Sequence, residues 1–271
     1  MHSRYKMIVS DMDDTLLTSH HTLSKATEEH LLELQQQGYY VVLASGRPTE
    51  GMFEVADKLQ LDHYQSHIIS YNGSVTMRYH DRKVVDATSI SKDNFDEIID
   101  FCRAQELFIL TYVDGEIVYE GQHEYMNIES ELTGLPMRKV HDLKEDVTVS
   151  VPKVMGVDYV ARITTARQQL GETFNSEIDL TTSKPYFLEF VPSGVSKGNA
   201  IRRLAQDLGI AMSEVIAFGD SINDISMIEA AGQGIAMDNA RDEVKNIANQ
   251  TTLSNDEDGI VHALKAILVE E

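Results

Sequence analysis

The two ends of the chain alternate short apolar strands with amphipathic helices, and this alternation constrains the fold more than any other feature. An apolar run at Met7–Ser10 is followed by a helical pattern in which Ser24 suits the N-cap and Gly38 the stop. The run Tyr39–Ala44 is continuously apolar, which is typical of a strand buried on both faces. This succession of strands and helices predicts a parallel sheet with right-handed crossovers.

The last third of the chain returns to the same alternation. The elements expected there are a helix from Ser196 to Leu208, a strand at Val215–Phe218, and helices that begin near Asp242 and Gly259. The simplest assembly is α/β: a doubly wound, Rossmann-like parallel sheet core formed by residues 1–82 and 190–271. In such sheets, ligands bind beyond the carboxyl ends of the strands.

The region between these two parts has a different pattern. It mixes helical and strand patterns, with helices expected at Asn94–Gln105 and Thr164–Phe174 and strands at Phe108–Tyr112, Ile117–Tyr119 and Lys153–Val157. Asp114-Gly115 is a hairpin signal between two of these strands. We therefore expect residues 83–189 to form an inserted α+β domain.

Acidic residues outnumber basic ones in this chain, with Asp+Glu 44 against Lys+Arg 23 and a formal net charge of −21. A surface this negative repels nucleic acid and anionic lipid, so neither is expected as a partner. It also repels phosphorylated metabolites. A phosphate site would therefore need local compensation from a metal cation, a lysine or backbone N–H groups.

The single cysteine, Cys102, excludes an internal disulfide, and its place in an apolar helical periodicity indicates a small buried side chain. No signal-peptide core follows the N-terminal residues, and no apolar run approaches the ~20 residues of a membrane helix. A cytoplasmic protein is expected.

Reactive residues follow the predicted strands, at the places where a doubly wound sheet binds its ligands. They are Asp11-Met12-Asp13-Asp14-Thr15, Ser45-Gly46-Arg47 and Gly219-Asp220-Ser221-Ile222-Asn223-Asp224, with Lys197 at a predicted helix start. Each of these alone is more typical of a solvated loop, a turn, a helix cap or a surface lysine. Their occurrence together and in this order indicates a functional site.

These segments resemble the four motifs of the haloacid dehalogenase (HAD)-like hydrolase superfamily, and more narrowly those of its Cof-type branch of sugar and small-metabolite phosphatases. Glu189–Gly198 is similar to the third motif with its flanks, and Gly219–Met227 matches the fourth, G-D-x-x-N-D-x-x-M. The similarity covers essentially the whole chain, including an insertion where this branch has its C2-type cap. One departure is Asp14, where the branch usually has Gly before Thr15. We expect Asp14 to face solvent without abolishing activity.

By this resemblance, Asp11 is the nucleophile that forms an aspartyl phosphate, and Asp13 is the general acid and then the base. The implied cofactor is Mg²⁺, bound by the side chains of Asp11 and Asp220 and by the backbone carbonyl of Asp13. Asp224 is either a direct metal ligand or an outer-shell partner. Four carboxylates in one crevice repel one another, so the pKa of Asp13 is expected to rise above its reference of about 3.9, with Mg²⁺ and Lys197 offsetting the remaining charge.

The resemblance also implies a set of groups that bind the phosphate oxygens. They are Lys197, which is in addition a catalytic residue, the Ser45 hydroxyl, the backbone N–H groups of Met12 and Gly46, and Asn223. Helix starts predicted at Gly46-Arg47-Pro48 and at Lys197 would direct further N–H groups at the anion. Arg47 either contacts the substrate or holds the loop of the site.

The implied function is Mg²⁺-dependent hydrolysis of phosphate monoesters of small metabolites, sugar phosphates first among them, by a monomer or homodimer. The insertion is by resemblance a mobile cap, with hinges expected near residues 72–84 and 183–192. Candidate specificity residues in the insertion are Tyr186, His123, Tyr125 and Arg162.

Two alternative functions share part of this pattern. A phospho-accepting signalling module also has acids at strand ends, although receiver domains are short and lack a large insertion. A hexose phosphomutase of the same superfamily would transfer the phosphoryl group rather than release it.

Overall fold

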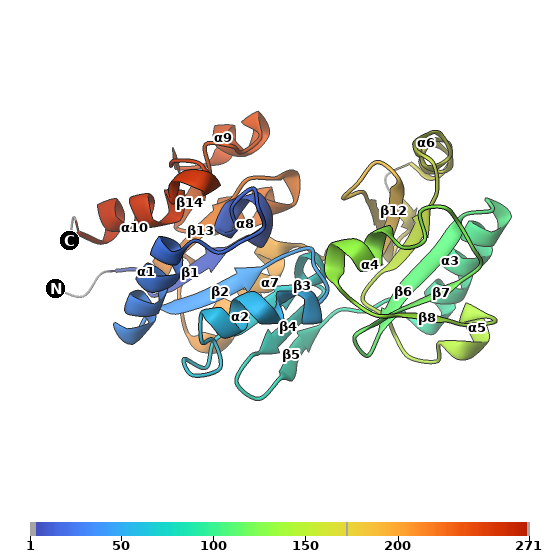
Figure 1. The fold of residues 1–271 in the computed structure, drawn as a ribbon, viewed down its shortest axis with the longest axis horizontal. Coiled ribbons are helices and arrows are strands. Elements are labelled where there is room, and N and C mark those ends of the chain that lie inside the picture. The colour runs from blue at the N-terminus through green and yellow to red at the C-terminus, as the bar shows by residue number, and fades with distance from the viewer. Residues whose placement is uncertain (1–3, 172, 270–271) are drawn as a thin grey trace. The chain divides into compact units, whose positions relative to one another are not determined.

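A computed structural model describes residues 4–171 and 173–269. It contains two compact units (Figure 1), one formed by Met1–Arg47, Met52–Asp86 and Ser196–Glu271 and the other by Pro48–Gly51 and Ala87–Val195. The division predicted from the sequence, after residues 82 and 189, differs from this one in two strands and in Pro48–Gly51, which groups with the second unit. Strand β5 (Lys83–Ala87) pairs in the first sheet, and β12 (Phe187–Pro192) pairs in the second.

The first unit is built on an eight-stranded sheet with the strand order β15-β14-β13-β1-β2-β3-β4-β5. Neighbouring strands from β15 to β3 are parallel, whereas β4 pairs antiparallel with β3. The other bounds are β1 Met7–Ser10, β2 Tyr40–Ala44, β3 His67–Ser70, β4 Val75–Arg78, β13 Val215–Gly219, β14 Gln233–Ala236 and β15 Gln250–Thr251. The chain winds outward from β1 in one direction and from β13 in the other. The carboxyl ends of β1 and β13 therefore form the switch point at which such sheets bind ligands.

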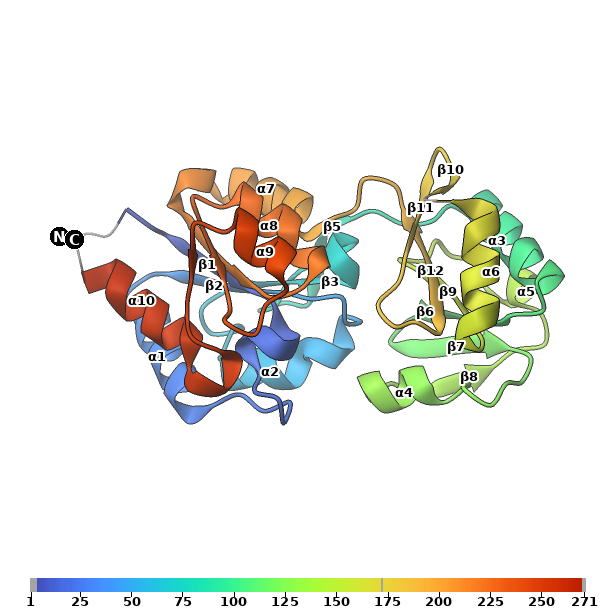
Figure 2. The same ribbon diagram turned by 90° about the horizontal axis from the view of Figure 1, so that it is seen from above.

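Helices cover both faces of this sheet. Figure 2 shows α7, α8 and α9 on one face and α1, α2 and α10 on the other. Their bounds are α1 Lys25–Gln36, α2 Phe53–Lys58, α7 Lys197–Leu208, α8 Ile225–Ala230, α9 Asp242–Ile247 and α10 Gly259–Val269. Because both faces are covered, all residues of β1, β3 and β13 are buried, which explains the continuously apolar strand patterns. The doubly wound α/β fold expected from the sequence is confirmed.

The second unit contains a seven-stranded sheet with the order β10-β11-β12-β9-β6-β7-β8, in which all pairs except β7–β8 are antiparallel. Apolar side chains of α3 and α6, such as Phe95 and Ile163, share a core with Ile109, Val154 and Leu188 of the strands. The bounds are α3 Lys92–Ala104, β6 Phe108–Val113, β7 Glu116–Glu120, α4 Ile128–Thr133, β8 Met137–Lys139, α5 Leu143–Asp146, β9 Val154–Val157, α6 Val160–Leu170, β10 Thr173–Asn175 and β11 Ile178–Thr181.

The helix predicted at Thr164–Phe174 was wrong at both ends. It begins at Val160 and ends at Leu170, because Gly171 leaves the helix with φ +78° and Thr173–Asn175 pairs as strand β10. The segment Ser183–Pro192, expected to hold a hinge, consists largely of β12, whose six residues are all buried. That part of the segment belongs to the core of the second unit.

Three local predictions are confirmed. The Ser24 hydroxyl accepts a hydrogen bond from the Thr27 N–H at 3.1 Å and caps α1. Asp114 and Gly115 have φ +50° and +78°, as the tight hairpin between β6 and β7 requires. Cys102 is fully buried. Among the helices of residues 4–171 and 173–269, none has both the length and the apolarity to cross a bilayer.

Candidate active site

Two acids meet where the parallel strands β1 and β13 end side by side. The strands pair with Ser10 opposite Phe218, and the Asp11 N–H donates to the Phe218 carbonyl at 3.1 Å. Asp11 directly follows β1, and Asp220 directly follows β13. The sheet register therefore brings together two residues that lie about two hundred positions apart in the sequence.

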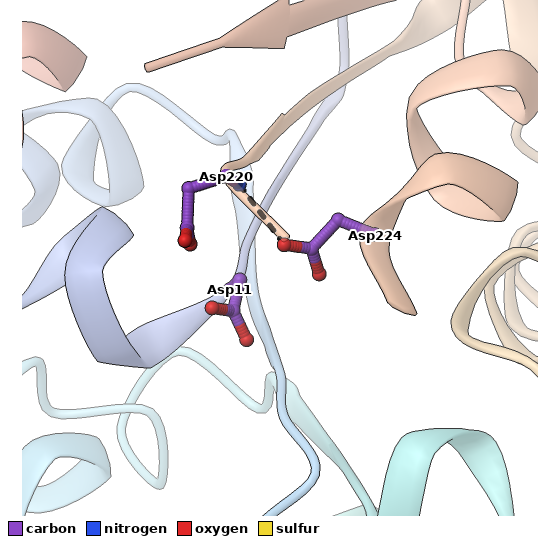
Figure 3. Close-up of side chains that lie close together, drawn as sticks. All are labelled: Asp11, Asp220 and Asp224. Atoms are coloured by element: carbon purple, nitrogen blue, oxygen red, sulfur yellow. Dashed lines mark hydrogen bonds between the residues drawn. The ribbon is translucent and has the colours of Figure 1, made fainter. Parts of the chain in front are cut away.

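Asp224 completes a group of three carboxylates. Oxygen atoms of Asp11, Asp220 and Asp224 lie within 4.8 Å of one another, and all three side chains are buried (Figure 3). Asp224 reaches the other two because its Oδ2 accepts hydrogen bonds from the backbone N–H groups of Asp220 and Ser221, both at 3.0 Å. Gly219 is required at this turn, since a Cβ there would lie 2.5 Å from the Asp224 Cβ.

Lys197 supplies the positive charge among these acids. Ser196 caps α7 by accepting the Asn199 N–H at 3.1 Å, which places Lys197 in the first turn of the helix. Its ammonium donates to Asp11 Oδ1 and, at 2.6 Å, to Asp224 Oδ1. The Lys197 side chain has no exposed surface.

The electrostatics of this group favour binding of a further cation. Burial and the charge of Asp224 raise the pKa of Asp11 well above its ordinary range, although Lys197 acts in the opposite direction. Burial also raises the pKa of Asp220, while a hydrogen bond from the Thr15 hydroxyl at 2.7 Å acts against this. One ammonium thus does not balance three buried carboxylates. A hard divalent cation with oxygen ligands, such as Mg²⁺, fits this donor set.

Asp13 has a partner that the sequence did not indicate. The Arg47 guanidinium donates to both carboxylate oxygens, from Nε at 2.8 Å and from a terminal nitrogen at 2.6 Å. Burial alone would raise the pKa of Asp13, but the hydrogen bonds and charge of Arg47 outweigh it and leave the pKa below its usual value. The expected rise in the pKa of Asp13 was wrong for this arrangement, because a cation faces the carboxylate.

This ion pair also changes the charge balance of the site. Four carboxylates are opposed by Lys197 and Arg47, so a divalent cation would bring the sum to zero without a proton on Asp13. The bonds from Arg47 to Asp13 are compatible with its holding the loop of the site, and its contact with substrate stays a prediction.

Apart from Lys197 at the start of α7, the predicted phosphate-binding residues follow β1, β2 and β13. Ser45 follows β2, and its hydroxyl accepts the Arg47 N–H at 3.1 Å. This bond closes a turn. A 3-10 helix follows at Glu50–Met52 and α2 at Phe53, so the helix start predicted at Gly46-Arg47-Pro48 was too early in the chain. The side chain of Met12 is buried, so only its backbone N–H is left for the phosphate binding expected of it.

Three residues of the site had no role predicted from the sequence. Thr15 and Ser221 donate their hydroxyls to the two oxygens of Asp220, at 2.7 and 2.8 Å. Asn72 follows β3 and accepts a hydrogen bond from Asn223 Nδ2 at 2.9 Å. Thr15 and Ser221 belong to the strand-end segments named from the sequence, and a wider use of the strand-end rule would have added Asn72.

Asp14 adopts a left-handed backbone conformation, with φ +58°, and its side chain is exposed. This conformation is easiest for glycine and tolerated by Asp, which gives a physical reason for Gly at this position in related sequences. The expectation that Asp14 faces solvent is confirmed.

The candidate specificity residues gather within the second unit. The rings of His123, Tyr125 and Tyr186 form an aromatic cluster with Tyr159, with neighbouring centroids 5.2–5.8 Å apart. Arg162 is not part of this cluster. Its Nε donates a hydrogen bond to a carboxylate oxygen of Asp158 at 2.7 Å.

The chain is similar to known proteins over nearly its full length. The family described as haloacid dehalogenase-like hydrolase matches residues 8–264. The protein YxeH of Bacillus subtilis is 34% identical over 98% of this chain and 99% of its own length. Phosphatase YwpJ of the same organism is 30% identical over 97% of this chain and all of its own.

A solved structure shares both the fold and much of the sequence. The crystal structure of a haloacid dehalogenase-like hydrolase from Bacteroides thetaiotaomicron superposes with a TM-score of 0.91 at 36% identity, covering 97% of this chain and 99% of that one. Acids follow β1 and β13, and a buried lysine lies between them. Together with the family match and these relatives, this arrangement shows that the chain belongs to the haloacid dehalogenase-like hydrolases.

Proposed function

We propose that the protein is a Mg²⁺-dependent phosphatase that hydrolyses phosphate monoesters of small metabolites through a phosphorylated Asp11. One observation carries the proposal. Asp11 is a buried carboxylate at the switch point of the sheet, and its oxygens lie among Lys197, Asp220 and Asp224. With Lys197 and a bound cation offsetting the neighbouring acids, Asp11 would attack as a carboxylate and need no general base.

In the first step, an oxygen of Asp11 attacks phosphorus, and the bond from phosphorus to the ester oxygen breaks. The leaving alkoxide takes a proton from Asp13, which forms the alcohol. In the second step, Asp13 removes a proton from water, which attacks the aspartyl phosphate to release inorganic phosphate and regenerate Asp11. Because Arg47 holds Asp13 as a carboxylate, Asp13 must leave this ion pair before it can carry the proton.

The metal would be held by the side chains of Asp11 and Asp220 and by the backbone carbonyl of Asp13. Asp224 is better suited to the outer shell, because one of its oxygens accepts from Lys197 and the other from two backbone N–H groups. When bound, Mg²⁺ offsets the negative charge of the phosphoryl oxygens next to the carboxylates. Lys197, Ser45, Asn223 and the N–H groups of Met12 and Gly46 would bind the same oxygens.

Phosphate monoesters with different leaving groups are candidate substrates. The names of some relatives state a substrate, and two such relatives illustrate the range. They are 5-amino-6-(5-phospho-D-ribitylamino)uracil phosphatase YitU of Bacillus subtilis, 28% identical, and pyridoxal phosphate phosphatase YbhA of Escherichia coli, 27% identical. Sugar phosphates are our first candidates, and we propose that residues 83–189 act as the cap domain that selects among such compounds.

The test is phosphate release from p-nitrophenyl phosphate and from a panel of sugar, pyridoxal and nucleotide monophosphates, with Mg²⁺ and with a chelator. We expect catalytic turnover in Mg²⁺ that stops on chelation. Replacing Asp11 by Asn should lower kcat by at least about 10⁴-fold, while Asp14→Asn, which removes an exposed acid three residues away, serves as the matched control.

Three results would overturn the proposal. Turnover by Asp11→Asn at the wild-type rate would exclude Asp11 as the nucleophile. A stable phosphoprotein without phosphate release would indicate a signalling module, and an isomerised sugar phosphate would indicate a phosphomutase.

A further inference from the structure

The turn that follows β3 touches three of the site segments at once. The Tyr71 N–H donates to the Arg47 carbonyl and the Asn72 N–H to the Ser45 carbonyl, both at 3.0 Å. On its other side, Gly73 lies so close to Ser196 that a Cβ on Gly73 would be 2.4 Å from the Ser196 carbonyl oxygen. The turn at residues 71–73 is therefore packed between the Ser45–Arg47 loop and the start of α7.

Asn72 is the side chain of this turn that reaches the site. Its Oδ1 accepts a hydrogen bond from Asn223 Nδ2 at 2.9 Å. Its amide also lies against Gly46, since a Cβ on Gly46 would be 3.1 Å from Asn72 Oδ1 and 3.3 Å from Nδ2. One half-buried amide thus contacts two residues from separate loops, Gly46 after β2 and Asn223 after β13.

The backbone of Asn72 is left-handed, with φ +57°. Asn tolerates this conformation better than most residues, and Gly tolerates it best. The conformation alone would therefore be satisfied by Gly. The left-handed backbone therefore does not explain why this residue carries an amide side chain.

We infer that Asn72 is a positioning residue for the reaction proposed above: its amide orients Asn223 toward the phosphoryl oxygens. The inference rests on the proposed function for its chemistry. What it adds to the proposed function is one statement: Asn72 affects the reaction through its hydrogen bond to Asn223.

The test is a double-mutant cycle between Asn72→Gly and Asn223→Ala, measured as kcat/KM for p-nitrophenyl phosphate in Mg²⁺. We expect each single variant to lose about tenfold, which is the size of a lost hydrogen bond in a site. The double variant should lose little more than either single variant, because the second change removes an interaction that is already broken. Losses that multiply to about a hundredfold would show that the two residues act independently and would overturn the inference.

Two further variants separate the amide from the backbone. Asn72→Ala also removes the amide but retains a Cβ in the left-handed conformation, so it should match Asn72→Gly in kcat/KM while melting at a lower temperature. Gln65→Gly is the matched control, because Gln65 is exposed and has φ +53° in the same unit. It should keep wild-type kcat/KM. Wild-type activity in Asn72→Gly would refute the positioning role.

The same cycle measured on binding of orthovanadate by calorimetry separates this inference from the proposed function. If the wild type binds orthovanadate but does not turn over, the proposed function fails, while coupling between positions 72 and 223 in binding still supports the positioning role. Independent effects on binding would contradict it.

Discussion

Each unit of the protein buries a cluster of charged side chains, and the two clusters differ in how far cations balance the charge of their carboxylates. In the first unit, Asp11, Asp220 and Asp224 converge on one point around the single ammonium of Lys197. The pKa of Asp11 rises well above its ordinary value because burial and the neighbouring carboxylates leave negative charge without compensation.

In the second unit, each buried carboxylate has donors of its own. Glu189 accepts from Lys153 at 3.2 Å through one oxygen and from the N–H and hydroxyl of Ser183 through the other. Glu129 accepts from the Tyr112 hydroxyl. Burial would raise the pKa of Glu189, but the charge of Lys153 and these hydrogen bonds outweigh it and lower the pKa.

The difference teaches how to tell a site from a structural ion pair. A buried charge that is fully hydrogen-bonded stabilises one packing arrangement, whereas convergent charges of one sign require a ligand. Across residues 4–171 and 173–269, no other set of three metal-ligating side chains converges as Asp11, Asp220 and Asp224 do.

Removing the ammonium from each cluster in turn gives the largest contrast. Lys197→Met should lower kcat/KM for p-nitrophenyl phosphate by about 10²–10³-fold, because it removes a charge directed at the phosphoryl oxygens. Lys153→Met should lower the free energy of unfolding by about 3–5 kcal/mol, because it leaves Glu189 buried without its cation. Its turnover, assayed well below the melting temperature, should stay within a few-fold of wild type. A folded Lys153→Met protein with no activity would show that the second cluster takes part in the reaction.

Metal-linked stability should distinguish the clusters next. Mg²⁺ at about 100 times its dissociation constant should stabilise the wild type by about 2.7 kcal/mol, seen as a higher melting temperature. Asp220→Asn should abolish this shift, whereas Glu189→Gln should retain it. A shift that persists in Asp220→Asn would place the ion elsewhere.

The pH dependence of stability should be smaller, and its sign follows from Glu189. The pKa of Glu189 is lower in the folded state than its unfolded value of about 4.3, so the unfolded state binds more protons in that range. The stabilisation is present above pH 4.3 and is lost as the pH falls through the folded pKa. Protection factors of the β9 and β12 amides, which are corrected for the intrinsic pH dependence of exchange, should therefore fall on acidification in the wild type, and Glu189→Gln should flatten this dependence. An unchanged slope in the variant would assign the acid sensitivity to other groups.

The smallest effect is expected at Asp14. Replacing Asp14 by Gly removes the strain of a side chain on a left-handed backbone and should raise the free energy of unfolding by at most about 1 kcal/mol. The kcat/KM should stay within twofold of wild type. Thermal melting followed by circular dichroism, with turnover assayed in parallel, measures both. A large loss of activity would mean that Asp14 contributes to the site despite its exposure.

Local patterns in the sequence were enough to predict the first unit. Apolar runs such as Met7–Ser10 and Val215–Gly219 are read from neighbouring residues, and parallel strands that end in acids place those acids at one edge of the sheet. The second unit was harder because its strands are short and pair antiparallel. Thr173–Asn175 has only three residues, so it was absorbed into the preceding helical pattern.

By itself, the sequence determined the doubly wound core, the acids and lysine of the site, and the family to which the chain belongs. Only the tertiary structure decided that Arg47 faces Asp13, that Asn72 faces Asn223, and that Asp224 is held by backbone N–H groups. The physical reason is distance along the chain. Helix and strand patterns depend on residues a few positions apart, whereas the charge state and orientation of a side chain depend on whichever distant segment packs against it.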